Sequence, residues 1–330
     1  MYQAPLKIFT GTANQPLARE ISKYLKVEVG KLSISHFKDG EVYARIDENV
    51  RGTDVFVIQP TSKDVNYNLM ELAIIIDSLR RASASRITAV MPYYGYARQD
   101  RKAKSREPIT AKLVANLLTA TGADRVLTLD LHSGQIQGFF DIPLDNLTAA
   151  TLLANYICEK KLRDLVVVSP DAGGVKNARV LAKILAAPLA IIDKRREKHN
   201  MVEEMRVIGE VKLKTCIILD DMIDTGGTIL AAAKALKEND AGEVYVAATH
   251  GVLSEPAVER MTDNSIKEVI ITNTIDHTKD NLPNKIKVIS VGYLLGEAIK
   301  RIHEDKSISA LFEETLKKTN RRLNKYFVGR

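Results

Sequence analysis

The stretch from Ile217 to Thr228 constrains the fold of this chain more than any other; it reads I-I-L-D-D-M-I-D-T-G-G-T. Residues Thr215 to Leu219 are apolar and rich in β-branched side chains, which is typical of a buried strand in a parallel sheet. Ile229 to Glu238 has the composition and the apolar spacing of a helix. The residues between them are therefore predicted to form a turn from a strand into a helix.

Two sets of side chains in this turn indicate what it binds. One set suits a phosphate group, because glycines let the backbone approach, hydroxyls donate, and a helix N-terminus offers unpaired N–H groups. It consists of Thr225, Gly226, Gly227 and Thr228. The other set would repel an anion but can accept hydrogen bonds from hydroxyls or coordinate a divalent cation; it consists of Asp220, Asp221 and Asp224. The turn thus predicts a sugar phosphate as ligand, against the alternative of a solvated turn with chance acids and glycines.

Composition limits what the rest of the chain can be. With 330 residues, 45% of them hydrophobic, the chain can bury two cores of ordinary size. Cys158 and Cys216 have no C-x-x-C spacing, which argues against a disulfide scaffold or zinc knuckle and favours a reducing compartment. The sequence opens with no signal-like segment and has no apolar run of membrane-spanning length. We therefore expect a cytoplasmic protein without a membrane partner.

The positive charge of the chain is concentrated at its end. The formal net charge is +7, and Leu316 to Arg330 carries six basic residues without an acid. A solvated, partly helical tail is favoured over a nucleic-acid-binding arm, because no RNA- or DNA-binding motif accompanies it. We therefore expect no nucleic-acid partner.

Strand and helix patterns alternate along nearly the whole chain, which predicts an α/β fold with a mostly parallel sheet. The other expected strands are Lys7–Phe9, Asp54–Gln59, Arg86–Met91, Arg125–Leu129, Leu165–Val168, Leu189–Asp193, Val244–Thr249 and Val269–Thr272. The other expected helices are Leu17–Tyr24, Leu69–Leu79, Thr110–Ala120, Val175–Leu185 and Leu294–His303, with one more beyond Ser309. Lys31 to Ile46 alternates as a hairpin does, with its turn at F-K-D-G-E, Phe37 to Glu41.

Two connections in the first half carry candidate ligand-binding side chains. The loop after Met91 is dense in tyrosine and arginine, which suits stacking on a base and pairing with phosphates; we favour binding by Arg98 and Gln99 over a plain solvated loop. His132 follows a predicted strand at its carboxyl end, where α/β proteins place their chemistry. A lone histidine is otherwise more often structural than a ligand.

A run of three cations follows the strand Leu189–Asp193. If the chain stays extended there, alternation puts Lys194 and Arg196 on one face and Arg195 on the other. The pattern predicts that the outer two act on one anionic target, whereas a solvated basic turn would give no such pairing.

The motifs of the chain resemble, in order, those of the ribose-phosphate pyrophosphokinase family, of the phosphate-activated class. D-D-M-I-D-T-G-G-T is similar to the phosphoribosyl-diphosphate loop that this family shares with the type I phosphoribosyltransferases. The other matching motifs are F-K-D-G-E, N-V-R-G, Y-G-Y-A-R-Q-D-R-K, D-L-H, G-F-F-D, S-P-D-A-G-G, D-K-R-R and S-I-S-A-L-F. The resemblance extends to Phe312.

Two related domains of the type I phosphoribosyltransferase kind are expected, each with a mostly parallel sheet flanked by helices. Locally, D-V-F-V-I-Q, a polar turn, a helix and R-I-T-A-V-M correspond to C-I-I-L-D-D, the T-G-G-T turn, a helix and E-V-Y-V-A-A. We place the first domain at 1–147 joined by 305–314, the second at 148–304, and a basic tail at 315–330. Only the second domain keeps the phosphate turn.

Carried over position by position, the resemblance implies a role for each candidate residue. ATP would be bound by Phe37, Asp39, Gly40, Glu41, Arg98 and Gln99, with Phe37 near the adenine. Mg²⁺ would be held by His132 and Asp171, and Lys194 and Arg196 would be catalytic at the transferring phosphoryl group. Ribose 5-phosphate would be bound by Arg196, Asp220, Asp221, Asp224, Thr225, Gly226, Gly227 and Thr228.

The implied reaction transfers the diphosphoryl group of ATP to the 1-hydroxyl of ribose 5-phosphate, giving 5-phosphoribosyl 1-diphosphate and AMP for nucleotide biosynthesis. In this family the F-K-D-G-E turn serves a neighbouring subunit's site, so the resemblance implies a homohexamer built from dimers. It also implies activation by phosphate and inhibition by ADP at an interface that includes Ser307, Ser309 and Phe312. Serines beside a helix start are, however, just as easily caps.

Two alternatives to this activity remain open. A phosphoribosyltransferase would need one such domain plus a hood, and the intact F-K-D-G-E, Y-A-R-Q-D and D-K-R-R motifs argue against it. A non-catalytic regulatory paralogue would have lost catalytic residues, whereas His132, Asp171, Lys194 and Arg196 are all in place. The sequence also lacks a Walker A motif, a kinase glycine-rich loop and H-E-x-x-H. We favour the diphosphotransferase.

Overall fold

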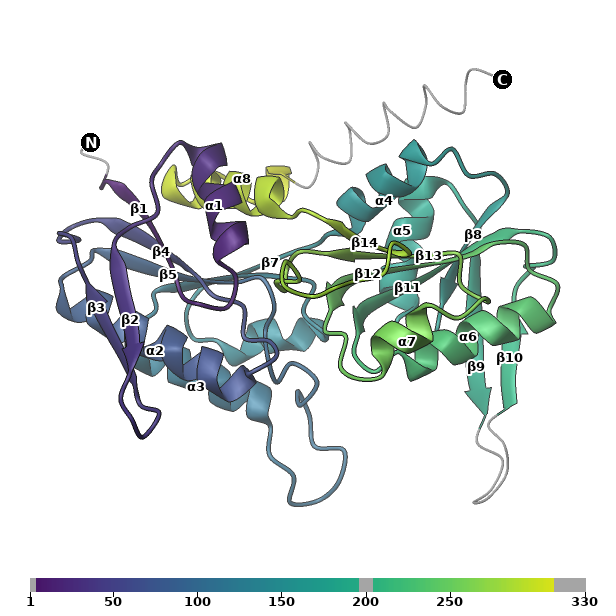
Figure 1. Ribbon diagram of the computed structural model, residues 1–330, viewed down its shortest axis with the longest axis horizontal. Coiled ribbons are helices and arrows are strands. Elements are labelled where there is room, and N and C mark those ends of the chain that lie inside the picture. The colour runs from purple at the N-terminus through teal and green to yellow at the C-terminus, as the bar shows by residue number, and fades with distance from the viewer. Residues whose placement is uncertain (1–3, 196–203, 312–330) are drawn as a thin grey trace. The chain divides into compact units, whose positions relative to one another are not determined.

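A computed structural model describes residues 4–195 and 204–311 of the chain (Figure 1). The described chain forms two compact units. The first comprises residues 4–148, 274–279 and 290–311, and the second residues 149–195, 204–273 and 280–289. Each unit has its own mostly parallel sheet with helices packed on it, so the predicted α/β class is confirmed.

The sheet of the first unit has five parallel strands in the order β1-β4-β5-β6-β7. Their bounds are β1 Leu6–Thr10, β4 Asp54–Ile58, β5 Arg86–Met91, β6 Arg125–Leu129 and β7 Leu144–Leu147. In Figure 1, α1 (Gln15–Leu25) and α8 (Gly292–His303) lie on one face, and α2 (Val65–Arg81) and α3 (Thr110–Thr121) on the other. Because both faces are covered, every residue of β4 is buried.

A separate hairpin stands beside this sheet. It consists of β2 (Leu32–His36) and β3 (Val42–Ile46), which pair antiparallel as the alternating sequence predicted. Its apolar side chains pack on the core beside α2; they are Leu32, Ile34, Ala44 and Ile46. The turn between the strands carries F-K-D-G-E at its tip.

The sheet of the second unit has seven strands in the order β10-β9-β8-β11-β12-β13-β14, all parallel except β10. The strands are β8 Leu165–Ser169, β9 Leu189–Arg195, β10 Glu204–Ile208, β11 Thr215–Ile223, β12 Val244–Gly251, β13 Glu268–Thr272 and β14 Ile286–Ile289. The helices are α4 Ala150–Glu159, α5 Val175–Leu185, α6 Gly227–Glu238 and α7 Ala257–Met261. A short 3₁₀ helix, Gly134–Phe139, belongs to the first unit.

β11 lies at the centre of the second sheet and is buried on both faces. Cys216 and Ile218 point into the core that contains residues of α6, whereas Ile217 and Leu219 point into the core that contains residues of α5. This period of two is the alternation expected of a strand. The strand therefore fixes where the following turn leaves the sheet.

Most expected elements are confirmed, but β11 is longer than predicted. The acids after Leu219 were expected to open a turn, yet the strand continues to Ile223. Its backbone stays paired with β12, where Asp220 lies opposite Ala248 and Met222 opposite His250. Pairing with a neighbouring strand thus outweighs the turn preference of consecutive acids.

Some elements were not expected from the sequence. They are β7, β10, β14, α4, α7 and the 3₁₀ helix. The strands among them are short and partly polar; β7, for example, reads L-D-N-L. Residues 309–311 are helical where a helix beyond Ser309 was expected, and the tail expected at 315–330 lies outside the described residues.

Helix α8 belongs to the first unit, although the sequence placed residues 292–303 in the second domain. It packs on α1, where Tyr24 meets Tyr293 edge-on at 5.1 Å between ring centroids and donates from its hydroxyl to Glu297 at 2.6 Å. Alternation of strands and helices along a chain does not show which sheet a late helix covers. The boundary could not be read from that pattern.

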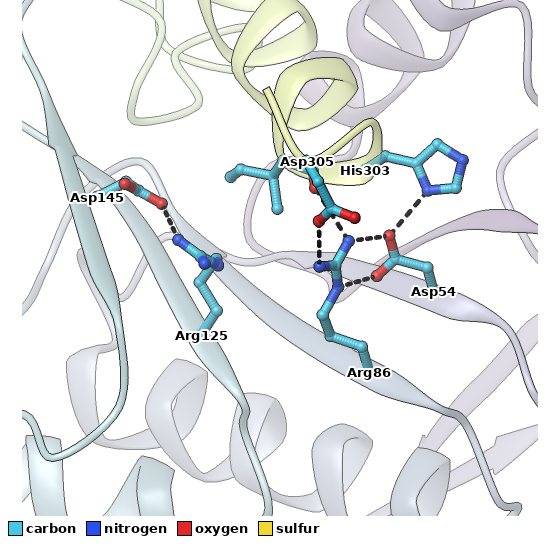
Figure 2. Close-up of polar contacts among 7 residues, drawn as sticks. Asp54, Arg86, Arg125, Asp145, His303 and Asp305 are labelled. Atoms are coloured by element: carbon cyan, nitrogen blue, oxygen red, sulfur yellow. Dashed lines mark hydrogen bonds and ion pairs between the residues drawn. The ribbon is translucent and has the colours of Figure 1, made fainter. Parts of the chain in front are cut away.

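An ion-paired cluster joins the end of α8 to the first sheet (Figure 2). Asp54 and Arg86, the first residues of β4 and β5, form two hydrogen bonds, from Nε to Oδ1 at 2.8 Å and from Nη2 to Oδ2 at 2.6 Å. His303 Nδ1 lies 2.8 Å from Asp54 Oδ2, and Arg86 Nη1 lies 3.3 Å from Asp305 Oδ1. We call these four residues the paired cluster.

In the described ranges, no helix is long and apolar enough to cross a membrane.

Candidate active site

The phosphate loop, defined here as Asp224 to Thr228, connects β11 to α6. Gly226 is the N-cap of α6 and has φ +72°, a left-handed conformation that glycine adopts without strain. The cap has no side-chain hydrogen bond, and the first turn of α6 contains no acid. The N–H groups in the first turn of a helix have no carbonyl partner within that helix, and they are the donors that the sequence argument assigns to an anion.

The acidic pair Asp220 and Asp221 lies at the carboxyl end of β11, directly before this loop. The backbone N–H of Asp221 donates to Asp220 Oδ1 at 2.9 Å. Burial, and then the nearby charges of Asp221 and Asp171, raise the pKa of Asp220 to about 8. Carboxyls at this edge thus repel one another, and a ligand that supplies a cation or hydroxyl protons would relieve that repulsion.

Asp171 lies in the S-P-D-A-G-G loop after β8, which neighbours β11 in the sheet. Its Oδ1 accepts a hydrogen bond from the backbone N–H of Gly174 at 2.9 Å, and its carbonyl oxygen accepts one from the Ser169 hydroxyl at 2.7 Å. These bonds fix the carboxylate of Asp171 at the same edge of the sheet as Asp220. The structure therefore brings together the predicted metal ligand Asp171 and the predicted ribose-binding acids.

The predicted catalytic cations can be placed only in part. The backbone of Lys194 is in β9, which continues through Arg195 and pairs Lys194 with Met205 of β10. The chain is therefore extended at this point, as the alternation argument required. Arg196 lies outside the described residues.

In the first unit, Arg98 and Gln99 line a pocket of about 510 Å³ beyond the carboxyl end of β5. Other lining residues include Lys63, Tyr67 and Tyr96. Gln99 is anchored to α3, because its carbonyl accepts from the Ala111 N–H at 3.1 Å and its side chain accepts from the Thr110 hydroxyl. Arg98 itself is exposed.

The tyrosines of this connection were expected to form a surface for a base, and for Tyr94 that expectation is wrong. Tyr94 is 2% exposed, whereas Tyr93 and Tyr96 line the pocket with Arg98 and Gln99. Tyr94 packs edge-on against Phe140 and donates from its hydroxyl to the carbonyl of Ala111 at 2.9 Å. Tyr94 therefore serves mainly to hold α3 beside β5.

The hairpin tip presents the F-K-D-G-E residues to solvent. The turn is closed by hydrogen bonds from the Phe37 N–H to the Glu41 carbonyl at 2.9 Å and from the Gly40 N–H to the Phe37 carbonyl at 3.0 Å. Phe37 is 56% exposed and meets Tyr43 edge-on. Asp39 is also exposed, and its Oδ1 accepts from the Glu41 N–H at 3.2 Å. Phe37 and the 43% exposed Tyr43 thus form a small exposed aromatic pair at this tip.

His132 is exposed just after β6, at the carboxyl edge of the first sheet. It lies in the first unit, whereas Asp171 lies in the second. Within the described chain, no group of three or more His, Cys, Asp and Glu side chains is arranged to hold a metal ion. The predicted pair of protein ligands is smaller than such a group.

The predicted regulatory serines follow α8. The Ser307 hydroxyl accepts from the Ala310 N–H at 3.4 Å, and its carbonyl accepts from Arg301 Nη1 at 3.1 Å. Both Ser307 and Ser309 are exposed, and Phe312 lies outside the described residues. The contact at Ala310 is a long helix-capping bond, so the cap alternative is realised at least in part.

Sequence reasoning missed one residue that contacts the phosphate loop. Arg260, in α7, donates from Nη1 to the carbonyl oxygen of Thr225 at 2.9 Å. Its surroundings read A-V-E-R-M, a short helix without a glycine or turn signal. Only the folded packing of α7 against α6 reveals it.

Known proteins resemble this chain along most of its length. Residues 6–122 match the model of the N-terminal domain of ribose phosphate pyrophosphokinase, and residues 193–313 match that of the phosphoribosyl synthetase-associated domain. Ribose-phosphate pyrophosphokinase 2 of Enterococcus faecalis is 57% identical over 310 residues, 93% of this chain and 96% of that protein. Ribose-phosphate pyrophosphokinase of Bacillus caldolyticus is 57% identical over 311 residues, 94% of this chain and 99% of that one.

A solved structure agrees with these relatives. The crystal structure of phosphoribosylpyrophosphate synthetase from Mycobacterium smegmatis matches with a TM-score of 0.87 and 48% identity, covering 91% of this chain and 99% of that one. Identity of this order over nearly the full length of both chains, together with the phosphate loop and the acidic pair at one sheet edge, means that the chain belongs to the ribose-phosphate pyrophosphokinase family.

Proposed function

We propose that this chain transfers the diphosphoryl group of ATP to the 1-hydroxyl of ribose 5-phosphate, giving 5-phosphoribosyl 1-diphosphate and AMP. The observation that carries the proposal is the joining, within one unit, of an anion-binding helix start with a set of mutually repelling acids. A sugar phosphate satisfies both groups at once. Relatives at 57% identity that are named for this activity support it further.

Ribose 5-phosphate binds with its phosphate at the phosphate loop and its hydroxyls at the acids of β11. The N–H groups at the start of α6 and the hydroxyls of Thr225 and Thr228 donate to the phosphate oxygens. Asp220 and Asp221 accept from ribose hydroxyls and so hold the 1-hydroxyl in line with the diphosphoryl group. Because its pKa is raised, Asp220 can also donate a proton in such a bond.

The acids fit a divalent cation, and we assign Mg²⁺ to His132 and Asp171. Oxygen donors suit Mg²⁺, and the charges of Asp171 and Asp221 already destabilise an ionised Asp220 in this region. The Gly174 N–H orients the carboxylate of Asp171. When bound, the metal neutralises charge on the phosphate oxygens.

Phosphoryl transfer is catalysed mainly by positioning and by neutralising negative charge as it spreads. Lys194 and Arg196 supply the cations for the diphosphoryl group. The extended backbone of β9 at Lys194 supports this assignment, because the alternation argument from the sequence requires an extended chain there. No protein nucleophile is required.

ATP binds through Arg98 and Gln99 of one subunit and the hairpin tip of another. The anchored loop at Gln99 and the 56% exposure of Phe37 support this division. The hairpin's Asp39, Gly40 and Glu41 then contact the nucleotide together with Phe37. Such an exchange requires an oligomer, and a hexamer of three dimers regulated by phosphate and ADP is the assembly we propose.

A coupled assay for AMP tests the activity directly. The purified protein should form AMP only when ATP, ribose 5-phosphate and Mg²⁺ are all present, and phosphoribosyl diphosphate should appear in equal amount. ATP consumption without ribose 5-phosphate would contradict the proposal. Consumption of added phosphoribosyl diphosphate with a free base would instead identify a phosphoribosyltransferase.

A further inference from the structure

Helix α7 packs directly against the phosphate loop. A Cβ atom on Gly226 would lie 2.9 Å from Met261 Cε, and one on Gly227 would lie 3.4 Å from Arg260 Nη1. The absence of a side chain at Gly226 therefore lets α7 approach the loop closely, and Arg260 Nη1 lies at ordinary contact distance from the Gly227 position. This approach brings the guanidinium of Arg260 into contact with the loop backbone.

Arg260 forms a hydrogen bond to one side of the peptide group between Thr225 and Gly226. An anion in the phosphate loop would bind the N–H on the opposite side of the same peptide group. Its Nη1 donates to the carbonyl oxygen of Thr225 at 2.9 Å. In a planar trans peptide the carbonyl and the following N–H point in opposite directions. The Gly226 N–H therefore points away from Arg260, and a cation on the carbonyl strengthens that N–H as a donor.

The positive charge of Arg260 also favours an anion at the phosphate loop. The guanidinium lies beside Gly227, the first residue of α6, where the helix dipole already favours anions. We infer that Arg260 is a positioning residue for the 5-phosphate of ribose 5-phosphate, acting through the Thr225–Gly226 peptide. This inference rests on the proposed function for the identity of the ligand.

The attachment of α7 does not depend on Arg260. Ala257 and Met261 of the same helix are both 0% exposed and hold it to the core. Arg260 is only half-buried and borders a hollow of about 460 Å³ that is also lined by Leu230 and Asp263. Loss of the guanidinium therefore admits water rather than collapsing the core.

Three variants test the inference. Arg260→Met keeps the length of the side chain but removes the donor and the charge, and Arg260→Lys keeps a charge and a donor. Glu259→Gln alters an exposed neighbour on the same helix and serves as the matched control. Steady-state kinetics with each substrate and calorimetric titration of ribose 5-phosphate without ATP give KM and Kd separately.

Loss of the charged hydrogen bond from Arg260 to the Thr225 carbonyl should weaken ribose 5-phosphate binding about tenfold in Arg260→Met, with the KM for ATP unchanged. Arg260→Lys should recover part of the loss, and Glu259→Gln should match the wild type. Equal changes for both substrates, or an unchanged Kd for ribose 5-phosphate, would overturn the inference.

The design separates this inference from the function it rests on. If the wild type binds ribose 5-phosphate but forms no AMP, the proposed reaction fails, while the titrations still decide the role of Arg260. If the wild type does not bind ribose 5-phosphate at all, both fail. If Arg260→Met does not fold, the same selective loss is required of Arg260→Lys, and its absence overturns the inference.

Discussion

The two units each contain a set of acids at one end of their strands, and the sets differ in what surrounds them. In the paired cluster, Asp54 is 3% exposed and is matched by Arg86 and His303 (Figure 2). At the acidic edge of the second unit, by which we mean Asp171, Asp220 and Asp221, burial and then the other two acids raise the pKa of Asp220 to about 8. The carboxylate of Asp54 thus faces cationic partners within the protein, whereas that of Asp220 faces other acids.

This difference follows the direction of the strands. The paired cluster lies at the amino ends of β4 and β5, and the acidic edge at the carboxyl end of β11. In parallel sheets ligands bind at the carboxyl ends. The carboxylate that is paired within the protein therefore lies away from the expected binding edge, and the one beside other acids lies at that edge.

The largest expected effect tests whether Lys194 and Arg196 supply the positive charge that acts with the acidic edge during catalysis. Lys194→Ala and Arg196→Ala should each lower kcat by on the order of 10³ or more, because cations on a phosphoryl transition state contribute that much. KM should change less, since the contacts act mainly in the transition state. Arg195→Ala is the control and should be milder, because the alternation argument from the sequence separates it from the other two cations. Small and equal losses in steady-state kinetics at all three positions would remove the catalytic assignment.

The next effect tests whether the paired cluster is structural. Asp54→Ala removes the buried, two-bond partner of Arg86 and leaves it with the exposed carboxylate of Asp305, so the free energy of unfolding should fall by about 3 kcal/mol. Asp77→Ala is the matched control, because it breaks an exposed pair with Arg81 and should cost less than about 0.5 kcal/mol. Urea unfolding followed by circular dichroism measures both. The kcat of folded Asp54→Ala should equal that of the wild type; a selective loss of kcat would place the cluster in the active site.

A smaller effect tests the imbalance at Asp220. Its folded pKa of about 8 lies above the ordinary 3.8, so between these values the folded state binds more protons than the unfolded state. Stability should therefore fall as pH rises from about 4 to 8, by at most about 1.4 kcal/mol per pH unit. Asp220→Asn cannot ionise and should lack this slope.

Urea unfolding at pH 5 and pH 8, without metal or substrate, checks the prediction. The free energy of unfolding of Asp220→Asn should exceed that of the wild type by more at pH 8 than at pH 5. Asp221→Asn is the control that removes the neighbouring charge, and it should reduce the slope without abolishing it, because burial is the larger cause. A wild type with the same pH dependence as Asp220→Asn would show that the acidic edge is already balanced.

The sequence predicted those elements whose signals lie within a short stretch of chain. The phosphate loop was predictable because an apolar β-branched run, two glycines and a helical run follow one another within a few turns of chain. The hairpin was predictable for the same reason, since Asp39-Gly40 lies between alternating strands. The strand–turn–helix and the hairpin depend on residues that are close in sequence, and the structure contains both elements.

Sequence failed where distant segments decide the outcome. Pairing with β12 extends β11 through Asp220, contacts with α1 and β5 draw α8 into the first unit, and the packing of Tyr94 against Phe140 buries a ring expected at the surface. Arg260 was missed because only the approach of α7 brings it to the phosphate loop. None of these contacts has a periodic or motif signal.

The smallest expected effect concerns Ser307, which follows α8 and so adjoins the paired cluster. Its hydroxyl makes a long capping bond of 3.4 Å to the Ala310 N–H, so Ser307→Ala should cost at most about 0.5 kcal/mol of stability. If the hydroxyl also donates to activating phosphate, the phosphate concentration for half-maximal AMP formation should rise about fivefold, the worth of one modest hydrogen bond. Ser307→Thr keeps a hydroxyl and is the control.

Because this segment is held by Arg301 and by the contact of Arg86 with Asp305, a phosphate response would extend the paired cluster from structure to regulation. Identical phosphate curves for the wild type and Ser307→Ala would instead leave Ser307 as a helix cap and keep the two sets of acids distinct in role.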